Sequence, residues 1–448
     1  MNLNFHRIMR RALGISAGAL LAATLTLGTA LAQDVTTVKM VLWPGPEGDA
    51  MQKVVNAWNA NQGAAQKIKV DMILLSRDDT FARETTEIAT QSSSVDIYFV
   101  ASYNVNFYQQ GLDPIDNLGI DEASYFAPVV SGLKIGGKLY ALPLDVSNHF
   151  LYYRKDLIDE LLRSDKLKAK YRAISAQVLG AEREPKPASE WDANDYLAMS
   201  AYFSRAANPD SPTKYGTALQ LKTAVFNITL WDDLLWGLGG AWTGADGKAN
   251  LATLEAKKAM NVYKTIYENH WTSPDSAEWE YSETNSALKI NDAAFAIQWS
   301  AAYAELTNPK LSPTIADKIA VAPVPGNPHA THVHALAIGL NKYSAHKKAA
   351  DVWMKYLATP EAMDAYAKAG GIPSMPAVLA DNVALNPAFT AISAHAGKYG
   401  YSPPLFAGTF TAMSQIIEAL SPGWVGLSSI DDAVADANAK LQTQLDTK

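Results

Sequence analysis

The residues best suited to ligand chemistry lie together in one otherwise apolar stretch of the chain. Asp145, Ser147, Asn148 and His149 occupy four of five consecutive positions between two runs rich in apolar and aromatic residues. Burying such groups without partners is costly, so we expect them to be solvated or to face a polar ligand. Asp145 is the leading candidate because a carboxylate accepts two hydroxyl hydrogen bonds, and Asn148 is a second. A capping or hinge-stabilising role is the alternative for Asp145.

The preceding part of the chain adds further candidates, because strand and helix signals alternate there as in an α/β sheet. Strands are predicted at 38–42, 68–74 and 95–100, and Asp49 is expected to cap the helix after the first. Ligands of open α/β sheets bind beyond the carboxyl ends of the strands. The loops after the first and third strands therefore supply Trp43, Glu47, Ser102 and Asn104. Local packing in a surface loop is the alternative for Trp43.

The rest of the chain is predicted to continue as short helices and strands. The expected helices cover 81–89, 157–179, 226–240, 341–357, 409–420 and 430–445, and the expected strands cover 215–221, 294–299, 319–323 and 334–340. Pro143 should interrupt the register of the strand that leads into the polar stretch, because proline lacks an N–H and belongs at a sheet edge or a crossing rather than mid-sheet. The absence of a flexible linker between these units indicates lobes joined by crossing strands.

Several segments resemble bacterial extracellular solute-binding proteins of the carbohydrate-binding, maltose-binding-protein-like group. Residues 137–143 read Gly-Lys-Leu-Tyr-Ala-Leu-Pro and 153–157 read Tyr-Arg-Lys-Asp-Leu, which match the crossover of that family. Residues 294–299 resemble the strand that delivers an aromatic residue into the cleft, 334–339 the second crossing, and 371–374 the loop on which the lobes dock. The order and spacing of these segments extend the resemblance over most of the chain.

The resemblance implies a periplasmic binding protein type II-like fold, in which two α/β lobes are joined by crossing strands. The implied boundaries are a signal peptide at 1–32, an N-terminal lobe at 33–142 plus about 339–388, and a C-terminal lobe at 143–338 plus about 389–448. The implied function is capture of a carbohydrate, either a mono- or oligosaccharide or a polyol, by hinge closure. The loaded protein would deliver its ligand to the membrane permease subunits of an ABC transporter.

Aromatic residues complete the expected site, since the C–H faces of sugars pack on aromatic rings. Trp299 is the strongest of them because it ends a short strand just before a polar serine, although core packing is the alternative. Trp231 and Phe410 resemble cleft aromatics of the family by position. For both, a core role is the alternative, because aromatic residues on helices usually face the core.

Three nearby histidines, His329, His332 and His334, raise the question of a metal site. His332 and His334 share one face of the predicted strand. Zinc needs a third or fourth ligand, and no carboxylate or cysteine stands at a suitable spacing, so we predict neither a metal nor another cofactor. His334 is instead expected to line the site and to hydrogen-bond a ligand hydroxyl.

The N-terminus and the composition indicate an exported protein. Arg7, Arg10 and Arg11 precede an apolar run that ends in Ala-Leu-Ala, which is typical of a cleaved signal peptide; a membrane anchor is the alternative. The 448 residues contain no cysteine, which excludes disulfides, thiolate metal sites and a lipid-modified cysteine. The formal charge of −7 disfavours nucleic acid as a partner. We therefore expect a soluble monomer in the periplasm.

Enzyme signatures are poor. The chain contains no His-Glu-x-x-His and no complete Gly-x-x-x-x-Gly-Lys-Ser/Thr, and its one Gly-x-Ser-x-Gly string, at 14–18, falls inside the predicted signal peptide. We therefore expect a binding protein and not an enzyme. A secreted glycosidase that uses a pair of cleft carboxylates is the alternative, because the separation of such a pair cannot be read from sequence.

Overall fold

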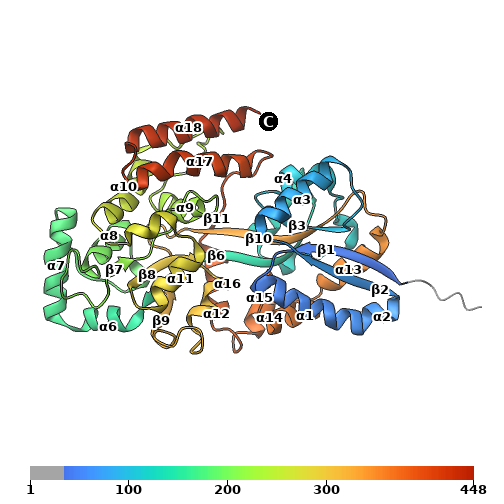
Figure 1. The fold of residues 1–448 in the computed structure, drawn as a ribbon, viewed down its shortest axis with the longest axis horizontal. Coiled ribbons are helices and arrows are strands. Elements are labelled where there is room, and N and C mark those ends of the chain that lie inside the picture. The colour runs from blue at the N-terminus through green and yellow to red at the C-terminus, as the bar shows by residue number, and fades with distance from the viewer. Residues whose placement is uncertain (1–34, 448) are drawn as a thin grey trace, which may run out of the picture. The chain divides into compact units, whose positions relative to one another are not determined.

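Two long antiparallel strands, β6 (Leu142–Arg154) and β10 (Thr331–Leu340), pair in the middle of the main sheet (Figure 1). The structure is a computed structural model that describes residues 35–447, so the predicted signal peptide at 1–32 lies outside the described residues. Every residue of β10 is buried, and β6 is buried at all positions except Ser147 and Tyr153. Burial on both faces explains why these strands read as nearly continuous apolar runs.

The main sheet has the strand order β2-β1-β3-β10-β6-β8-β7, and β9 and β11 pair with β6 and β10. The flanking strands are β1 (Thr36–Leu42), β2 (Ile68–Leu74), β3 (Ile97–Ala101), β7 (Tyr215–Thr217), β8 (Ala293–Trp299), β9 (Ile319–Ala322) and β11 (Gly400–Tyr401). The strands β1, β2 and β3 are parallel, whereas β10 is antiparallel to both β3 and β6. A separate hairpin joins β4 (Lys134–Ile135) to β5 (Lys138–Leu139).

Helices cover the sheet on both sides of the crossing pair (Figure 1). Those beside β1–β3 are α1 (Pro46–Ala60), α2 (Gln62–Gln66), α3 (Arg77–Ala89), α4 (Val105–Tyr108), α13 (Lys347–Leu357), α14 (Pro360–Ala369) and α15 (Pro376–Asp381). Those beside β6 and β10 are α5 (Ala127–Ser131) and α16 (Ala388–Lys398).

The remaining helices gather around β7–β9 and the far end of the crossing pair (Figure 1). They are α6 (Lys155–Arg163), α7 (Asp165–Leu179), α8 (Ala193–Tyr202), α9 (Asn227–Gly237), α10 (Leu254–Glu268), α11 (Tyr281–Lys289), α12 (Ala302–Leu306), α17 (Thr409–Trp424) and α18 (Ile430–Asp446). Single 3-10 turns occur at Gln109–Gly111, Asp116–Leu118, Glu122–Ser124, Ala188–Glu190 and Pro274–Glu278. The mixed α/β class predicted from sequence is confirmed.

Pro143 lies inside β6, and the prediction that it interrupts the register of this strand is confirmed. The register of the β6–β10 pair shifts beside it, because Pro143 pairs with Ala337 whereas Asp145 pairs with Leu336. Leu144 is the extra residue of the resulting bulge. A bulge disturbs the ladder locally, and such irregular positions are where a strand tolerates a residue without an N–H.

Other differences from the predicted bounds have local causes. The helix α1 begins at Pro46, so Asp49 lies in its first turn and is not its cap. Proline favours the first helical position because its missing N–H would have no partner there. The single helix predicted over 157–179 divides at Ser164, whose hydroxyl caps α7 by accepting the Leu167 N–H.

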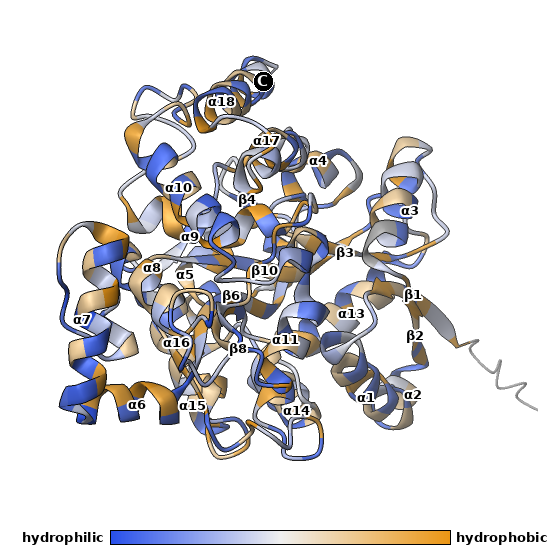
Figure 2. Cartoon of the chain, turned by 60° about the vertical axis from the view of Figure 1, so that its left-hand side comes forward, coloured by the Kyte–Doolittle hydropathy of each residue, from blue (hydrophilic) through white to orange (hydrophobic). Residues whose placement is uncertain are grey.

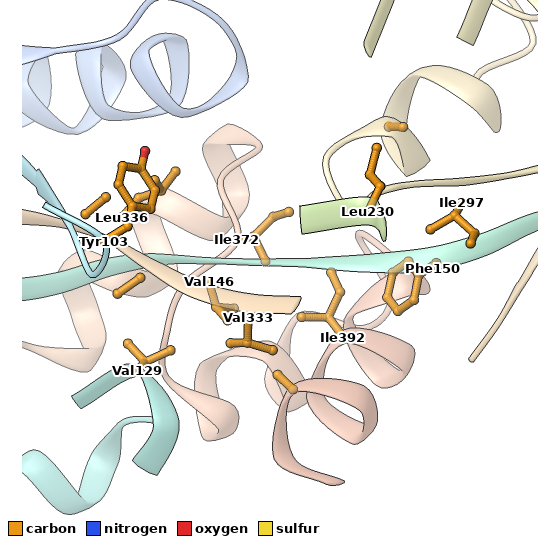
Figure 3. Packing of buried hydrophobic residues seen from close by; sticks show 14 of the residues in the cluster. Tyr103, Val129, Val146, Phe150, Leu230, Ile297, Val333, Leu336, Ile372 and Ile392 are labelled. Atoms are coloured by element: carbon orange, nitrogen blue, oxygen red, sulfur yellow. The ribbon is translucent and has the colours of Figure 1, made fainter. Parts of the chain in front are cut away.

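The hydrophobic core is continuous along the crossing strands. Figure 3 shows Val146 and Phe150 of β6 beside Val333 of β10, with Ile372 and Ile392 packed nearby. In Figure 2 the surrounding helices carry apolar and polar residues on different faces, as amphipathic helices on a core do. Within residues 35–447, no helix is both long and apolar enough to span a membrane.

Candidate functional site

A cavity of about 600 Å³ lies beside the crossing strands, among loops that follow the strands of both helix groups. Its aromatic and polar lining residues are Trp43, Glu47, Tyr103, Ser147, Gln220, Phe226, Asn227, Glu280, Tyr281, Trp299, Glu305, Asn308 and His334. Four of the residues predicted from sequence, Trp43, Glu47, Trp299 and His334, are among them. The structure therefore brings together residues more than 200 positions apart in the chain.

The loop between β1 and α1 presents Trp43 and Glu47. The Trp43 ring packs edge-on against Phe99, with ring centroids 4.5 Å apart, and against Phe81 at 5.8 Å. The backbone turns so tightly that a Cβ on Gly48 would lie 2.1 Å from the Trp43 carbonyl oxygen, so only glycine fits there. Glu47 lies in the first turn of α1, where the helix dipole favours a negative charge.

Tyr103, which follows β3, forms a second aromatic wall with Phe226. The two ring centroids are 5.3 Å apart, and Tyr103 also lies 5.4 Å from the His334 ring. Phe410 of α17 stacks behind Tyr103 at 5.9 Å and contacts Phe81 at 5.2 Å. Phe410 therefore supports this wall and is not itself one of the residues that line the cavity.

Trp299 ends β8 and lies half-buried at the cavity wall. Its ring packs edge-on against His149, its direct partner across the β6–β8 pair, at 4.1 Å, and against His334 at 5.2 Å. Its carbonyl oxygen accepts a hydrogen bond from the Tyr152 hydroxyl at 2.9 Å. These contacts fix the end of the strand, so the orientation of the indole ring is set before any ligand arrives.

Buried histidines support Trp299 from behind. The Nε2 atom of His332 lies 3.0 Å from Nδ1 of His334, and Nδ1 of His149 lies 2.8 Å from Oδ2 of Asp233. The other carboxylate oxygen of Asp233 accepts the His332 N–H at 2.6 Å. Asp233 thus forms hydrogen bonds with histidines on two strands, His149 on β6 and His332 on β10. Among residues 35–447, no group of three or more His, Asp or Glu side chains is arranged to hold a metal ion.

The charge states of this histidine cluster follow from its burial. Burial lowers the pKa of His149 to about 3, and it lowers the pKa of His332 well below its usual value. Burial also raises the pKa of Asp233, although the hydrogen bond from the His332 N–H opposes that rise. Both imidazole rings are therefore neutral at physiological pH, and they form an uncharged wall behind Trp299.

Three carboxylate side chains reach the cavity wall, at Glu47, Glu280 and Glu305. Glu280 Oε1 lies 2.5 Å from the Lys222 ammonium, and Glu305 Oε1 lies 2.7 Å from that of Lys289. Neither lysine lines the cavity. Glu280 and Glu305 are thus held from outside the cavity and present acceptor oxygens at its wall.

Asp145 lies beside the large cavity, at a neighbouring pocket of about 20 Å³ that Glu47 also lines. Its Oδ2 atom accepts hydrogen bonds from the Tyr366 hydroxyl and from the Ile372 N–H, both at 2.9 Å. Burial raises the pKa of Asp145, and the negative charge of Glu47 raises it further. Asp145 has protein partners in place of solvent, and these contacts match the alternative of a hinge-stabilising residue.

The other predicted residues lie outside the lining of the large cavity. Ser102, Asn104, Asn148 and Trp231 are all buried. Asn104 accepts the Ala101 N–H through its side-chain oxygen at 2.9 Å, which shapes the turn that carries Tyr103. Trp231 lies in the hydrophobic core on α9, a helix that is buried on every side.

Sequence analysis missed several lining residues. Tyr103 stands between the candidates Ser102 and Asn104, and its aromatic ring in that loop was the available signal. Glu280 and Tyr281 follow a tryptophan at the start of α11, so an acidic residue between two aromatic ones was the signal there. Glu305 lies on a short helix after Trp299, and no pattern in the neighbouring sequence indicates that it lines the cavity.

A cavity of this size, lined by aromatic rings with a few polar groups, defines a protein that binds a small molecule. The comparisons with known proteins specify the class further. Residues 53–391 match the family of bacterial extracellular solute-binding proteins. The chain belongs to this family, as the crossover segments predicted.

Curated relatives share about a quarter of their residues with this chain. A probable ABC transporter-binding protein of Deinococcus radiodurans is 24% identical over 319 residues, which cover 69% of this chain and 68% of the relative. A mannitol-binding protein of Pseudomonas aeruginosa is 25% identical over 49% of this chain and 45% of its own length. A probable amino-acid ABC transporter periplasmic-binding protein of Sinorhizobium fredii is 25% identical, and the match spans only 40% of its length.

Solved structures extend the likeness over nearly the whole chain. The maltose-bound MalE3 of T. maritima superimposes with a TM-score of 0.76 at 19% identity, covering 91% of this chain and 99% of that protein. A solute-binding protein of Agrobacterium vitis with bound D-mannitol gives a TM-score of 0.71 at 18% identity, covering 92% and 99%. The predicted periplasmic binding protein type II-like fold is therefore confirmed.

Proposed function

We propose that this protein captures a carbohydrate or polyol in the 600 Å³ cavity and delivers it to the permease subunits of an ABC importer. The observation that supports this ligand class is the composition of the wall. Aromatic faces at Trp43 and Trp299 match the C–H faces of a sugar, and acceptors at Glu47 and Gln220 match its hydroxyls. Family relatives and neighbours that bind mannitol or maltose support the same ligand class.

We further propose that the mature protein acts in the periplasm as a monomer, after removal of residues 1–32, and that it leaves its ligand chemically unchanged. Membership of an extracellular solute-binding family supports the location and the binding role. The glycosidase alternative requires a pair of available cleft carboxylates. Two of the three glutamates that line the cavity, Glu280 and Glu305, pair with Lys222 and Lys289. Asp145, which lines a small pocket with Glu47, has its Oδ2 engaged by Tyr366 and Ile372.

A sugar screen tests the proposal directly. A ligand that binds only the folded protein, present at about 100 times its dissociation constant, should stabilise it by about 2.7 kcal/mol. We expect a clear rise in melting temperature with at least one member of a panel of mono-, di- and oligosaccharides and polyols. The same ligand should be recovered intact after prolonged incubation. Turnover of a glycoside, or a panel without any stabilising member, would contradict the proposal.

The proposed mechanism is closure of two lobes about the crossing strands. We take the lobes as 33–142 plus about 339–388 and 143–338 plus about 389–448, with hinges near Pro143 and Gly339. Contacts from both lobes support this reading, since Glu47 and Tyr103 belong to one lobe and Phe226 and Trp299 to the other. A ligand that touches both lobes favours the closed state.

Small-angle scattering should detect this closure. We expect the radius of gyration to fall when the stabilising sugar is added at saturation, because contacts to both lobes favour the closed arrangement. The control is a sugar from the same panel that does not raise the melting temperature. An identical scattering profile with and without the bound ligand would indicate a rigid pocket.

A further inference from the structure

The charges around the cavity are unevenly distributed. Of the described residues that line it, three are glutamates, Glu47, Glu280 and Glu305, and none is lysine or arginine. Lys222 and Lys289 bind Glu280 and Glu305, and neither lysine lines the cavity. A ligand inside the cavity therefore meets carboxylate oxygens at several points and no basic side chain.

The corner at Glu47 is the most acidic part of the wall. Asp145 lines the small neighbouring pocket together with Glu47, so two carboxyl groups lie close to each other there. Glu47 also lies in the first turn of α1, near the positive end of the helix dipole. A second negative charge brought in by a ligand would be repelled at this corner.

The aromatic rings of the cavity wall also disfavour an anionic ligand. The faces of aromatic rings carry partial negative charge and attract cations. Trp43, Tyr103, Tyr281 and Trp299 all line the cavity. A ligand carboxylate or phosphate would lose its hydration on entering and would find no cation to replace it. A protonated amine would instead find both ring faces and carboxylates.

We propose that this cavity selects its ligand by charge: it accepts neutral sugars or polyols and their amino derivatives, and it rejects sugar acids and sugar phosphates. The inference rests on the proposed function and names the charge class of its ligand. An acid form should bind at least about tenfold more weakly than its neutral parent, which corresponds to a modest charge repulsion across a solvated cavity. An amino form should bind as well as the parent or better.

Matched ligand sets test this selectivity by calorimetry. The sets are glucose with glucosamine and glucuronate, mannitol with mannonate, and maltose with maltobionate. We expect binding of at least one neutral member, with the acid of the same set at least about tenfold weaker at low salt. The difference should shrink at high salt, because partly exposed charges are screened. An acid that binds as tightly as its neutral parent, or alone, would overturn the inference and leave the solute-binding function standing.

Single substitutions separate the cavity charges from the overall charge of the protein. Glu305→Gln keeps an acceptor for the Asn285 amide, 2.7 Å away, and leaves Lys289 without its carboxylate partner. We expect the acid-to-neutral affinity ratio to rise several-fold in this variant. Glu122→Gln is the control, because Glu122 pairs with Lys134 at 2.5 Å and neither lines the cavity. An equal change of the affinity ratio in both variants would show that the effect comes from the net charge of the protein and not from the cavity. A binding panel without any response would refute the proposed function itself.

Discussion

Replacing Trp299 with alanine is expected to weaken sugar binding at least about tenfold while the ligand-free protein keeps its melting temperature within a few degrees. The indole ring lies at the cavity wall, half-buried, and touches His149 and His334 through its edges. Removal of a fully buried Trp would cost about 3–5 kcal/mol of stability, whereas a half-buried ring loses less packing and leaves its space to solvent. Calorimetry with the stabilising sugar measures the affinity, and thermal melts of the free protein measure the melting temperature.

Two variants control this experiment. Trp299→Phe retains an aromatic face and should recover most of the lost affinity. Trp353→Ala removes a fully buried Trp that packs against Trp58, with ring centroids 5.3 Å apart, and neither of the two lines the cavity. It should lower the melting temperature strongly, and the folded fraction should bind normally. A large loss of stability in Trp299→Ala with normal affinity would show that Trp299 is a core residue.

Replacing Asp233 with alanine should lower the free energy of unfolding by about 1–3 kcal/mol for each of its two partners, because it leaves buried hydrogen-bonding groups unsatisfied. His149 Nδ1 and the His332 N–H would both lose their partner inside the protein. Asp233→Asn keeps an acceptor for the His332 N–H, so its free energy of unfolding should fall by less. Urea denaturation at neutral pH measures both variants, and a loss below about 1 kcal/mol for alanine would contradict this reading.

Asp210→Ala is the matched control for this pair. Asp210 contacts the Lys170 ammonium at 2.6 Å, but its side chain is 87% exposed. Exposed ion pairs add little to stability, since water screens them. The urea midpoint of this variant should therefore stay close to that of the wild type. Sugar affinity should fall in Asp233→Ala as well, because His149 and His332 both pack on Trp299.

The fold was predictable where local pattern and tertiary context agree. Ile68 and Val70 alternate with polar residues, and β2 has the predicted bounds. Pro143 was predictable in part. Its missing N–H predicts an interrupted register, and the pairing of β6 with β10 shifts its register beside Pro143. The partner strand lies almost 200 residues away, so local sequence could not reveal which strand pairs there.

The site was only partly predictable for a similar reason. Trp43 directly follows β1 and Trp299 ends β8, and both residues line the cavity, as chain geometry predicts. Trp231 lies on a helix that is buried on all sides, so periodicity could not tell a cavity face from a core face. Glu280 and Glu305 reach the cavity through loops and a short helix whose position is set by packing alone.

The central place of β10 also constrains the order in which this chain can fold. The sheet has β10 between β3 and β6, and β10 begins more than 170 positions after the end of β6. Until β10 has been made, β3 and β6 each have an open edge, and contacts so distant in sequence form slowly. An unfinished chain therefore cannot complete its main sheet until residues 331–340 have been made.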